Sequence, residues 1–508
     1  MKTLAVLAGA ALLATWPFLP AHAMVDPHDS HHSPAAHDDT VFPLQAALVP
    51  AVDFWTKVFA EWRRDQVALH DAEHLGVVYR VVRIPGPVAE GLTPAQRDWV
   101  RAQSERLAAD LRRLAAEQAA NRKPDPQLQQ LADAIRHGGG KFSGAADRVR
   151  AQRGTRERFL RGLEISGQYK REFRAIFRAQ GLPEDLAYLP HVESSFQIGA
   201  RSSVGAAGVW QFMPATARAF MTVNKTVDER LNPFTAAQAA ARYLSGAHRE
   251  LGSWPLAVTS YNHGIGSMRR AQSRFGNDFA RIVREYDAPS FGFASRNFYP
   301  EFLAVRRIVQ APQQYFPEGV RYHAPLSVTA VALTRPLHAQ DISRQTGMPL
   351  KTLAELNPGW SERALKGMAQ LPAGISVWLP ADSAVAGFSR PDRTQTARVQ
   401  NASGAHRVAA GESLWSIARR HGVTVASLSA HNGLHPSRTR LKVGQVLALP
   451  ETGKRSAAAT THRVTSGDTP FGIASAYRVS LRELLAANNL DERSVIRPGQ
   501  QLRIPAAD

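Results

Sequence analysis

Hydrophobic and polar positions repeat with helical spacing along the first part of the chain. Trp55, Val58, Phe59 and Trp62 stand at i, i+3, i+4 and i+7, which places them on one face of a helix. A Thr-Pro pair opens residues 93–114 and is typical of a helix start, because proline is well tolerated at the first helical position. The N-terminal region is therefore expected to be helical.

The middle of the chain continues the helical pattern. Residues 141–180 mix spaced apolar positions with many arginines, which predicts an amphipathic helix pair with a solvated basic face. A cationic wall along an anionic substrate is the alternative interpretation. Gly181-Leu182-Pro183 is typical of a helix end followed by a new helix. Residues 235–250 and 254–270 are again helical in pattern, so residues 140–310 predict an all-α domain.

The pattern changes in the last third, where one unit occurs twice. Residues 405–450 and 461–506 each predict a short strand, two helices and a returning strand. Residues 325–382 look like a degenerate third copy. The positions that recur are His406-Arg407-Val408 with His462-Arg463-Val464, Gly411-Glu412-Ser413 with Gly467-Asp468-Thr469, and Asn432 with Asn488.

The N-terminal residues predict a targeting signal followed by a linker. Residues 1–23 combine Lys2, an apolar run and an Ala-x-Ala end, which is typical of a secretory signal peptide. No later stretch is long and apolar enough to span a membrane, so an exported, soluble protein of the periplasm or cell envelope is expected; a retained N-terminal anchor is the alternative. Residues 24–45 are rich in His, Asp, Ser and Pro. We expect a disordered linker there rather than a metal site, because no ligand spacing recurs.

Composition narrows the possible partners. The 508 residues contain no cysteine, which excludes disulfides, thiolate metal sites, cysteine nucleophiles and a lipid anchor on cysteine. With 62 basic and 43 acidic residues the formal charge is +19, which favours an anionic partner. Export disfavours nucleic acid and leaves the cell envelope. No cofactor and no metal is predicted.

Three motifs and the repeats carry a resemblance to known families. Glu193-Ser194-Ser195-Phe196, the Gly-Ala-Ala-Gly-Val-Trp-Gln-Phe-Met-Pro run of residues 205–214, and Tyr261-Asn262-His263-Gly264 follow one another in order. Together they resemble the lytic murein transglycosylases of the goose-type-lysozyme-like fold, most closely the membrane-bound lytic murein transglycosylase D group. The repeats resemble LysM domains, which bind N-acetylglucosamine-containing glycans.

The resemblance implies a fold and a domain order. The fold expected is a mainly α lysozyme-like catalytic domain with an α-helical N-terminal extension, followed by small α+β (βααβ) LysM domains. The predicted segments are a signal peptide (1–23), a disordered linker (24–45), the helical extension (46–140), the catalytic domain (141–320), a degenerate LysM-like module (325–382), a linker (386–404), LysM 1 (405–450), a linker (451–460) and LysM 2 (461–506).

Glu193 is the candidate catalytic acid. Its neighbours along the sequence are largely apolar, and an apolar environment raises the pKa of a carboxyl group so that it can donate a proton near neutral pH. A surface carboxylate at a helix end is the alternative on the residues alone. Most glycosidases need a second carboxylate, but the spacing of Asp185, Asp228 and Glu229 marks none of them.

The resemblance resolves this by using the substrate. It implies that Glu193 acts first as acid and then as base on the β-1,4 bond between N-acetylmuramic acid and N-acetylglucosamine, with a 1,6-anhydromuramoyl product. Peptidoglycan glycan strands are then the partner. A hydrolytic muramidase and a non-catalytic peptidoglycan-binding protein are the alternatives.

The remaining motif residues are assigned by the resemblance. Trp210 and Phe212 are expected in the core. Gly205 and Gly208 are expected to let the backbone approach the glycan. Two departures are noted: Ala294 stands where many relatives have an acidic residue, and His263, which replaces a small residue, is expected to be a packed surface histidine. The substrate-binding candidates are Ser202, Gln211, Met213, Tyr261 and Asn262.

The LysM resemblance implies that glycan lies between the loop after the first strand and the loop after the second helix. Turn or cap chemistry is the alternative for these positions. The glycan-binding candidates are Gly411, Glu412, Ser413, Asn432 and Gly433 in the first copy, and Gly467, Asp468, Thr469 and Asn488 in the second.

Overall fold

The computed structural model describes residues 40–383 and, further on, chiefly 405–408, 417–418, 425–434, 445–449, 460–464, 481–491 and 499–504. The chain forms two compact units, Met1–Phe388 and Ser389–Asp508, each described by itself below. The predicted signal peptide (1–23) and the linker of residues 386–404 lie outside the described residues, as does the linker of residues 451–460 except for its last residue.

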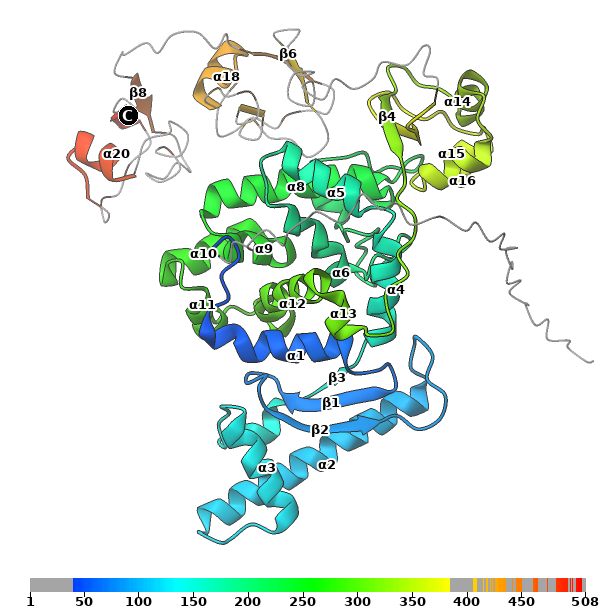
Figure 1. The fold of residues 1–508 in the computed structure, drawn as a ribbon. Helices are drawn as coiled ribbons and strands as arrows, with labels where there is room; N and C mark the ends of the chain where they lie inside the picture. Colours follow the sequence, from blue (N-terminus) through cyan, green and yellow to red (C-terminus); the bar gives the residue numbers. More distant parts are fainter. Residues whose placement is uncertain are drawn as a thin grey trace, which may run out of the picture. The chain divides into compact units, whose positions relative to one another are not determined.

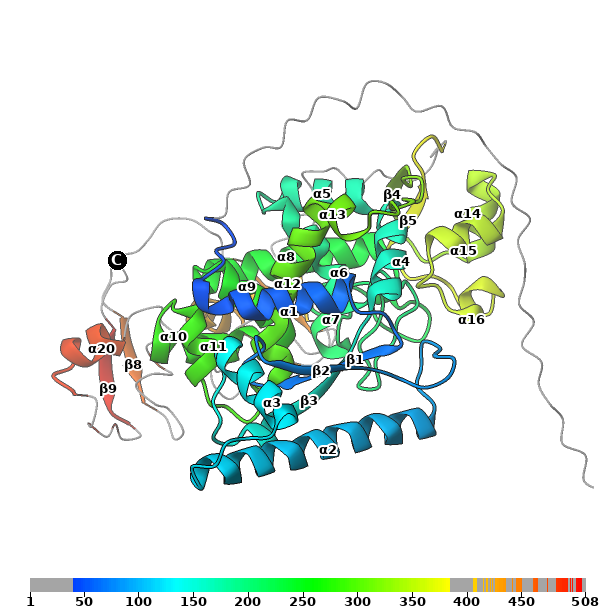
Figure 2. The same cartoon turned by 60° about the horizontal axis from the view of Figure 1, so that its bottom comes forward.

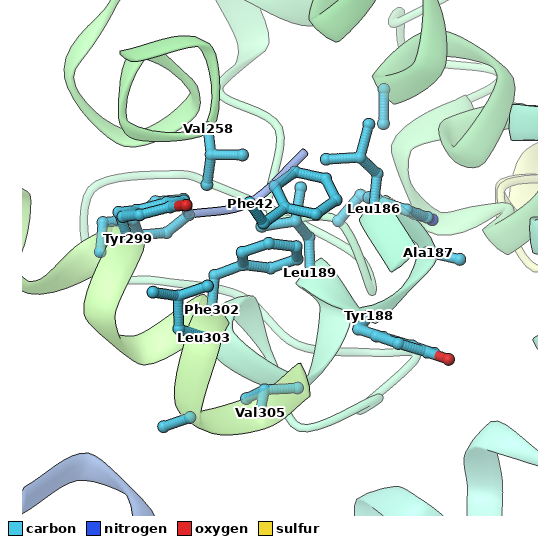
Figure 3. Packing of buried hydrophobic residues seen from close by; sticks show 14 of the residues in the cluster. Phe42, Leu186, Ala187, Tyr188, Leu189, Val258, Tyr299, Phe302, Leu303 and Val305 are labelled. Atoms are coloured by element: carbon cyan, nitrogen blue, oxygen red, sulfur yellow. The ribbon is translucent and has the colours of Figure 1, made fainter. Parts of the chain in front are cut away.

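The end of the predicted disordered linker belongs to the core of the first unit. The Phe42 ring is buried and lies 5.8 Å from the ring of Trp254 and 5.0 Å from that of Phe302. Figure 3 shows Phe42 beside Phe302. The prediction of disorder up to residue 45 was therefore wrong at its end, because an aromatic side chain supplies core contacts there. The next elements are η1 (Ala46–Leu48) and α1 (Val49–Ala60), whose predicted apolar face packs along α12 (Phe293–Gln310).

A three-stranded antiparallel sheet stands between α1 and two further helices (Figures 1 and 2). Its central strand buries both faces: Val67 and Leu69 join the core of α2 and α3, and Ala68 joins the core of α1. The predicted extension of residues 46–140 is thus only partly helical, and its last strand comes from beyond residue 140. A strand buried on both faces lacks the alternating pattern that identifies one. The strands are β1 (Gln66–Asp71), β2 (Val78–Arg83) and β3 (Val149–Arg153).

The two helices that cover this sheet begin at clear caps. The Thr93 hydroxyl accepts from the Gln96 backbone N–H, and the Gln96 side chain accepts from the Thr93 N–H, which forms a capping box. The Asp125 carboxylate caps the next helix by accepting from the Leu128 N–H. The predicted helix start at residue 93 is confirmed. The helices are α2 (Pro94–Ala119) and α3 (Pro126–His137), followed by η2 (Ala145–Arg148).

The helices of the first unit continue up to residue 315, as predicted, but residues 149–153 of the predicted helix pair form the strand β3, so the prediction of an all-α domain over residues 140–310 was wrong there. The alanine-rich α8 is buried over most of its length and packs against α5, α9 and α10. The predicted helix of residues 254–270 is two helices, because Gly264 has a φ of 86° and interrupts it. The elements are α4 (Arg156–Ser166), α5 (Lys170–Ala179), η3 (Glu184–Tyr188), α6 (Leu189–Glu193), α7 (Pro214–Ala217), η4 (Glu229–Leu231), α8 (Pro233–Leu251), α9 (Trp254–His263), α10 (Ile265–Phe275), α11 (Phe279–Glu285), α12 and α13 (Pro312–Tyr315).

The predicted degenerate module forms a small fold within the first unit. Its two strands pair antiparallel, and the helices between them cover a separate core. The observed order is the predicted βααβ plan with one short helix added. The elements are β4 (Val328–Ala332), α14 (Ala339–Thr346), α15 (Leu350–Leu356), α16 (Glu362–Leu365) and β5 (Ser376–Pro380).

The second unit contains the two predicted repeats, each with an antiparallel strand pair around its own small core. Among the described residues of both units, no helix has the length and apolar character needed to cross a membrane. The first repeat has β6 (Ala405–Arg407), α18 (Val425–His431) and β7 (Val446–Ala448); the second has β8 (Thr460–Arg463), α20 (Leu481–Ala487) and β9 (Gln501–Ile504).

Candidate active site

Glu193 is the last residue of α6, and the backbone that follows it is unusual. Ser195 and Phe196 have φ values of 52° and 56°, a left-handed conformation that costs a non-glycine residue about 1–2 kcal/mol. The Ser194 hydroxyl donates to the Val209 carbonyl at 2.9 Å. The chain therefore turns sharply after Glu193 and is tied to the loop that carries the second motif.

The environment of Glu193 keeps its carboxyl group neutral. The side chain is partly buried, and among the described residues it has no hydrogen-bond or ion-pair partner. Burial raises the pKa of Glu193 from 4.5 to about 8. A carboxyl group in this state carries a proton at neutral pH, which is what a general acid requires.

The second motif forms a compact loop, residues 200–213, that places Gln211 and Met213 on its outer part. Gln211 is left-handed, with a φ of 47°, and its Nε2 donates to the Gly208 carbonyl at 2.7 Å and to the Ala200 carbonyl at 3.3 Å. The Ser202 hydroxyl accepts from the Ala206 N–H at 2.9 Å. Met213 is 41% exposed. Trp210 and Phe212 are buried in the core, as expected.

Tyr261 joins this loop to the end of α9. Its hydroxyl donates to the Trp210 carbonyl at 2.9 Å, and burial together with the charge of Glu193 raises its pKa well above the usual value. Asn262 is exposed, and its Oδ1 accepts from the Ser295 hydroxyl at 2.8 Å. His263 packs edge-on against the Phe291 ring, as expected for a packed histidine. The structure thus brings Tyr261 to the loop of residues 200–213.

A second carboxyl group lies near Glu193 that the sequence analysis missed. Glu301 stands on α12, which packs against α6. Burial and the negative charge of Glu193 raise the pKa of Glu301 well above its usual range. Position 301 is seven residues, two helical turns, beyond Ala294, and so on the same helix face. No motif marked Glu301, because its place near Glu193 depends on the packing of α12 against α6.

Packing inside the protein requires a glycine at position 208. With a φ of 78°, a Cβ at this position would lie 1.8 Å from the carbonyl oxygen of Arg230. The expectation that Gly208 serves approach to a glycan is therefore replaced by close packing against Arg230. At Gly205, with a φ of 91°, a Cβ would meet nothing within 4 Å.

The asparagines of the repeats are structural clamps. Asn432 Nδ2 donates to the carbonyls of Leu428 and Ala448, both at 2.7 Å, and its Oδ1 accepts from the Ala448 N–H at 2.7 Å. Asn488 makes the same three contacts with Leu484 and Arg503. Both amide donors are occupied, which favours the alternative of a structural role at the junction of the second helix and the last strand; glycan binding by Asn432 and Asn488 stays a prediction.

Of the other predicted glycan contacts, only Gly433 is among the residues that the structure describes. Gly433 is exposed and has a φ of 62° at the end of α18, as a helix-terminating glycine does. Among the described residues no group of three or more His, Asp or Glu side chains could hold a metal ion. The candidates Gly411, Glu412, Ser413, Gly467, Asp468 and Thr469 lie outside the described residues.

Comparison with known families fits this arrangement. The transglycosylase SLT domain family matches residues 173–282, which include Glu193, the loop and Tyr261. The LysM domain family matches residues 406–450 and 462–505. The chain therefore combines a lysozyme-like SLT catalytic domain with C-terminal LysM domains, and it is an enzyme of the lytic transglycosylase class that acts on peptidoglycan.

One relative belongs to the predicted group, and another shares a shorter stretch of sequence. The chain is 26% identical over 360 residues to membrane-bound lytic murein transglycosylase D of Escherichia coli (strain K12), covering 67% of this chain and 75% of that protein. It is 36% identical over 117 residues to N-acetylmuramoyl-L-alanine amidase sle1 of Staphylococcus haemolyticus (strain JCSC1435), covering 22% of this chain and 35% of that one.

A solved structure also aligns with part of the chain. The 70 kDa soluble lytic transglycosylase of Escherichia coli matches at 16% identity with a TM-score of 0.25, and the match covers 46% of this chain and 32% of that one. The chain thus spans about a third of the length of that protein.

Proposed function

We propose that this enzyme cleaves the β-1,4 bond between N-acetylmuramic acid and N-acetylglucosamine and forms a 1,6-anhydromuramoyl end. The observation that carries the proposal is Glu193, a partly buried carboxyl group with a pKa raised to about 8. It lies beside a loop that contains Gln211 and accepts a hydrogen bond from the Tyr261 hydroxyl. Such a group donates a proton to a poor leaving oxygen at neutral pH.

The reaction then needs one carboxyl group in two roles. Glu193 gives its proton to O4 of the leaving N-acetylglucosamine while the C1–O4 bond breaks, and the muramoyl 2-acetamido oxygen stabilises C1 from the opposite side. The Glu193 carboxylate next takes the proton of the muramoyl 6-hydroxyl, and O6 bonds to C1. The proton returns to Glu193, and no water is consumed.

Tyr261 is suited to orient the acetamido group. Its hydroxyl proton is already donated to the Trp210 carbonyl, so its oxygen is left as an acceptor for the acetamido N–H. Met213 offers an exposed apolar surface to a sugar ring. Ser202, Gln211 and Asn262 are the polar candidates; both amide hydrogens of Gln211 are donated within the loop, so its side-chain oxygen is the group left for substrate. These residues would bind substrate rather than take part in proton transfer.

The LysM domains would hold the enzyme on the glycan. Tethering raises the local concentration of cleavable bonds without altering the chemistry. The positive charge of the chain adds attraction to an anionic wall. Residues 1–23 would direct the protein to the periplasm or cell envelope, where its substrate lies.

A sacculus digest tests the proposal. Purified sacculi are incubated with the parent enzyme and with Glu193→Gln, and the released muropeptides are analysed by mass spectrometry. We expect anhydro-muropeptides from the parent and a loss on the order of a thousandfold in the variant, as for removal of an essential acid. Glu105→Gln, the same change at an exposed position on α2, is the matched control.

Each contrary result has a clear meaning. Reducing muropeptides, heavier by one water, would show a hydrolytic muramidase with the same acid. Equal release by Glu193→Gln and the parent would remove Glu193 from the mechanism. Binding of sacculi with no release by any variant would leave a non-catalytic peptidoglycan-binding protein.

A further inference from the structure

The module of residues 325–382 is joined to the catalytic domain by exchanged core residues. Val227 of the catalytic domain is buried in the core of the module, and Trp378 of the module is buried in the core of the catalytic domain. The Trp378 ring stacks on Phe234 at 4.8 Å, and its Nε1 donates to the Thr235 hydroxyl at 2.9 Å. Neither core is complete without the other domain.

Backbone hydrogen bonds also join the module to the catalytic domain at this contact, which we call the seam (residues 226–228 with residues 359–361). The Asp228 N–H donates to the Gly359 carbonyl at 2.8 Å, and the Ser361 N–H donates to the Thr226 carbonyl at 2.9 Å. A Cβ at position 359 would lie 2.5 Å from the Asp228 carbonyl oxygen, so only glycine fits. The residues of the module that meet the catalytic domain here form the turn after α15.

The same turn is exposed at Gly433 and Asn489 in the described parts of the two LysM copies. Asn357 makes the same clamp as Asn432, with its Nδ2 on the carbonyls of Leu353 and Trp378 and its Oδ1 on the Trp378 N–H. After the clamp, Gly359 and Trp360 are buried, whereas Gly433, the residue directly after Asn432, is exposed. The clamped strand residue also differs: it is Trp378 in the module but exposed Ala448 and Arg503 in the LysM copies.

A partly buried ion pair between Asp228 and Arg230 connects this contact to the loop beside Glu193. Arg230 binds the Asp228 carboxylate with two nitrogens, at 2.9 and 2.8 Å. Its Nη1 donates to the Gly205 carbonyl at 2.7 Å and to the Phe212 carbonyl at 3.1 Å. One guanidinium thus joins the two sides of the loop that carries Gln211, and the fork geometry of arginine suits such a task.

We propose that the module of residues 325–382 is an internal brace of the active site rather than a third glycan-binding domain, and that Asp228 and Arg230 transmit its hold to the loop of residues 200–213. Arg230 is a positioning residue. The role of the brace in turnover rests on the proposed function, but its hold on the loop does not.

Three variants of the full-length protein test the brace. Arg230→Lys keeps the charge and loses the fork; Gly359→Ala forces the seam apart; Trp378→Phe loses the bond to Thr235 and keeps the ring stack. Arg344→Lys, on the exposed face of α14 in the same module, is the matched control. Hydrogen exchange over residues 200–214, the maximal rate on sacculi, sacculus binding and thermal melting are measured for each.

We expect faster exchange over residues 200–214 and a maximal rate lowered about tenfold or more in Arg230→Lys and Gly359→Ala, since small displacements of a positioning group have effects of this size. Trp378→Phe should show the same change in smaller measure, and sacculus binding should stay at the parent level in all of them. A merely structural role would lower the melting temperature without faster exchange confined to the loop.

Other results would overturn the brace. Parent-like exchange in folded Gly359→Ala and Arg230→Lys would show that the seam does not hold the loop. Weaker sacculus binding with an unchanged rate would show that the module captures glycan. If the parent itself releases nothing, the proposed function fails, while the exchange measurement still decides whether the loop is braced.

Discussion

The module of residues 325–382 and the LysM copy of residues 405–450 use one fold in two ways. Both clamp the second helix to the last strand with an asparagine, Asn357 in one and Asn432 in the other. The module buries the turn beyond that clamp and inserts Trp378 into its neighbour, whereas the LysM copy leaves Gly433 exposed. The fold therefore does not determine the role; the surroundings of its loops do. The module should govern turnover, and the LysM copies should govern capture.

Removing the clamp asparagine from each copy is the strongest way to break this comparison. Each substitution by alanine deletes the same three hydrogen bonds. In the module the backbone groups left unpaired are buried, which costs about 1–3 kcal/mol for each group, whereas those of Ala448 and Arg503 in the LysM copies are exposed to water. We expect Asn357→Ala to lower the maximal rate on sacculi more than about tenfold, with binding preserved, because it unsettles the brace.

Asn432→Ala and Asn488→Ala serve as each other's control and should weaken sacculus sedimentation while the rate at saturating sacculi stays near that of the parent. Loss of turnover in Asn432→Ala, or loss of capture alone in Asn357→Ala, would contradict the division of roles.

The pH dependence of turnover sharpens the comparison from the chemical side. Glu193 must be protonated to act as acid, and its pKa is raised to about 8. The maximal rate should fall as pH rises through about 8, approaching tenfold per pH unit above it. The rates of the parent and of Glu105→Gln are measured from pH 6 to pH 10.

Sedimentation of Glu193→Gln with sacculi over the same range reports capture alone and should not follow this decline. A rate that instead falls in step with binding would place the titration outside Glu193.

The smallest expected effect concerns Glu301. Burial keeps this group protonated, so Glu301→Gln replaces one neutral side chain with another. The rate at pH 7 should stay within about threefold of the parent, since an isosteric neutral exchange leaves the local charge unchanged. Measured beside Glu193→Gln, a loss of similar size in both would instead make Glu301 a partner in proton transfer.

The sequence analysis predicted most helices and the two LysM copies because periodicity and caps are local properties. Thr93 and Gly181 mark helix ends that the structure has. The sheet was missed because β1 is buried on both faces and its apolar run has no alternation. Phe42 was misjudged because a polar stretch concealed one aromatic residue whose partners, Trp254 and Phe302, are far away in the sequence.

The candidate site divides in the same way. Glu193 and Tyr261 lie in short motifs and could be named, whereas Arg230 and Glu301 act across the fold. Arg230 is defined by the carbonyls of Gly205 and Phe212, which no spacing along the chain reveals. The asparagines of the LysM copies show the converse: recurrence in both copies marked them as important but could not tell a clamp from a contact with sugar.

The left-handed residues around Glu193 bear on attempts to engineer the enzyme for heat tolerance. Ser195, Phe196 and Gln211 are three of five non-glycine residues with positive φ in the described part of the chain. Glycine at Ser195 would relieve about 1 kcal/mol of backbone conflict. It would also make the backbone turn after Glu193 more flexible, and that turn orients the Glu193 carboxyl group. Stability and turnover rate are therefore opposed at this turn. Substitutions that raise thermal stability are better placed on the outer helices.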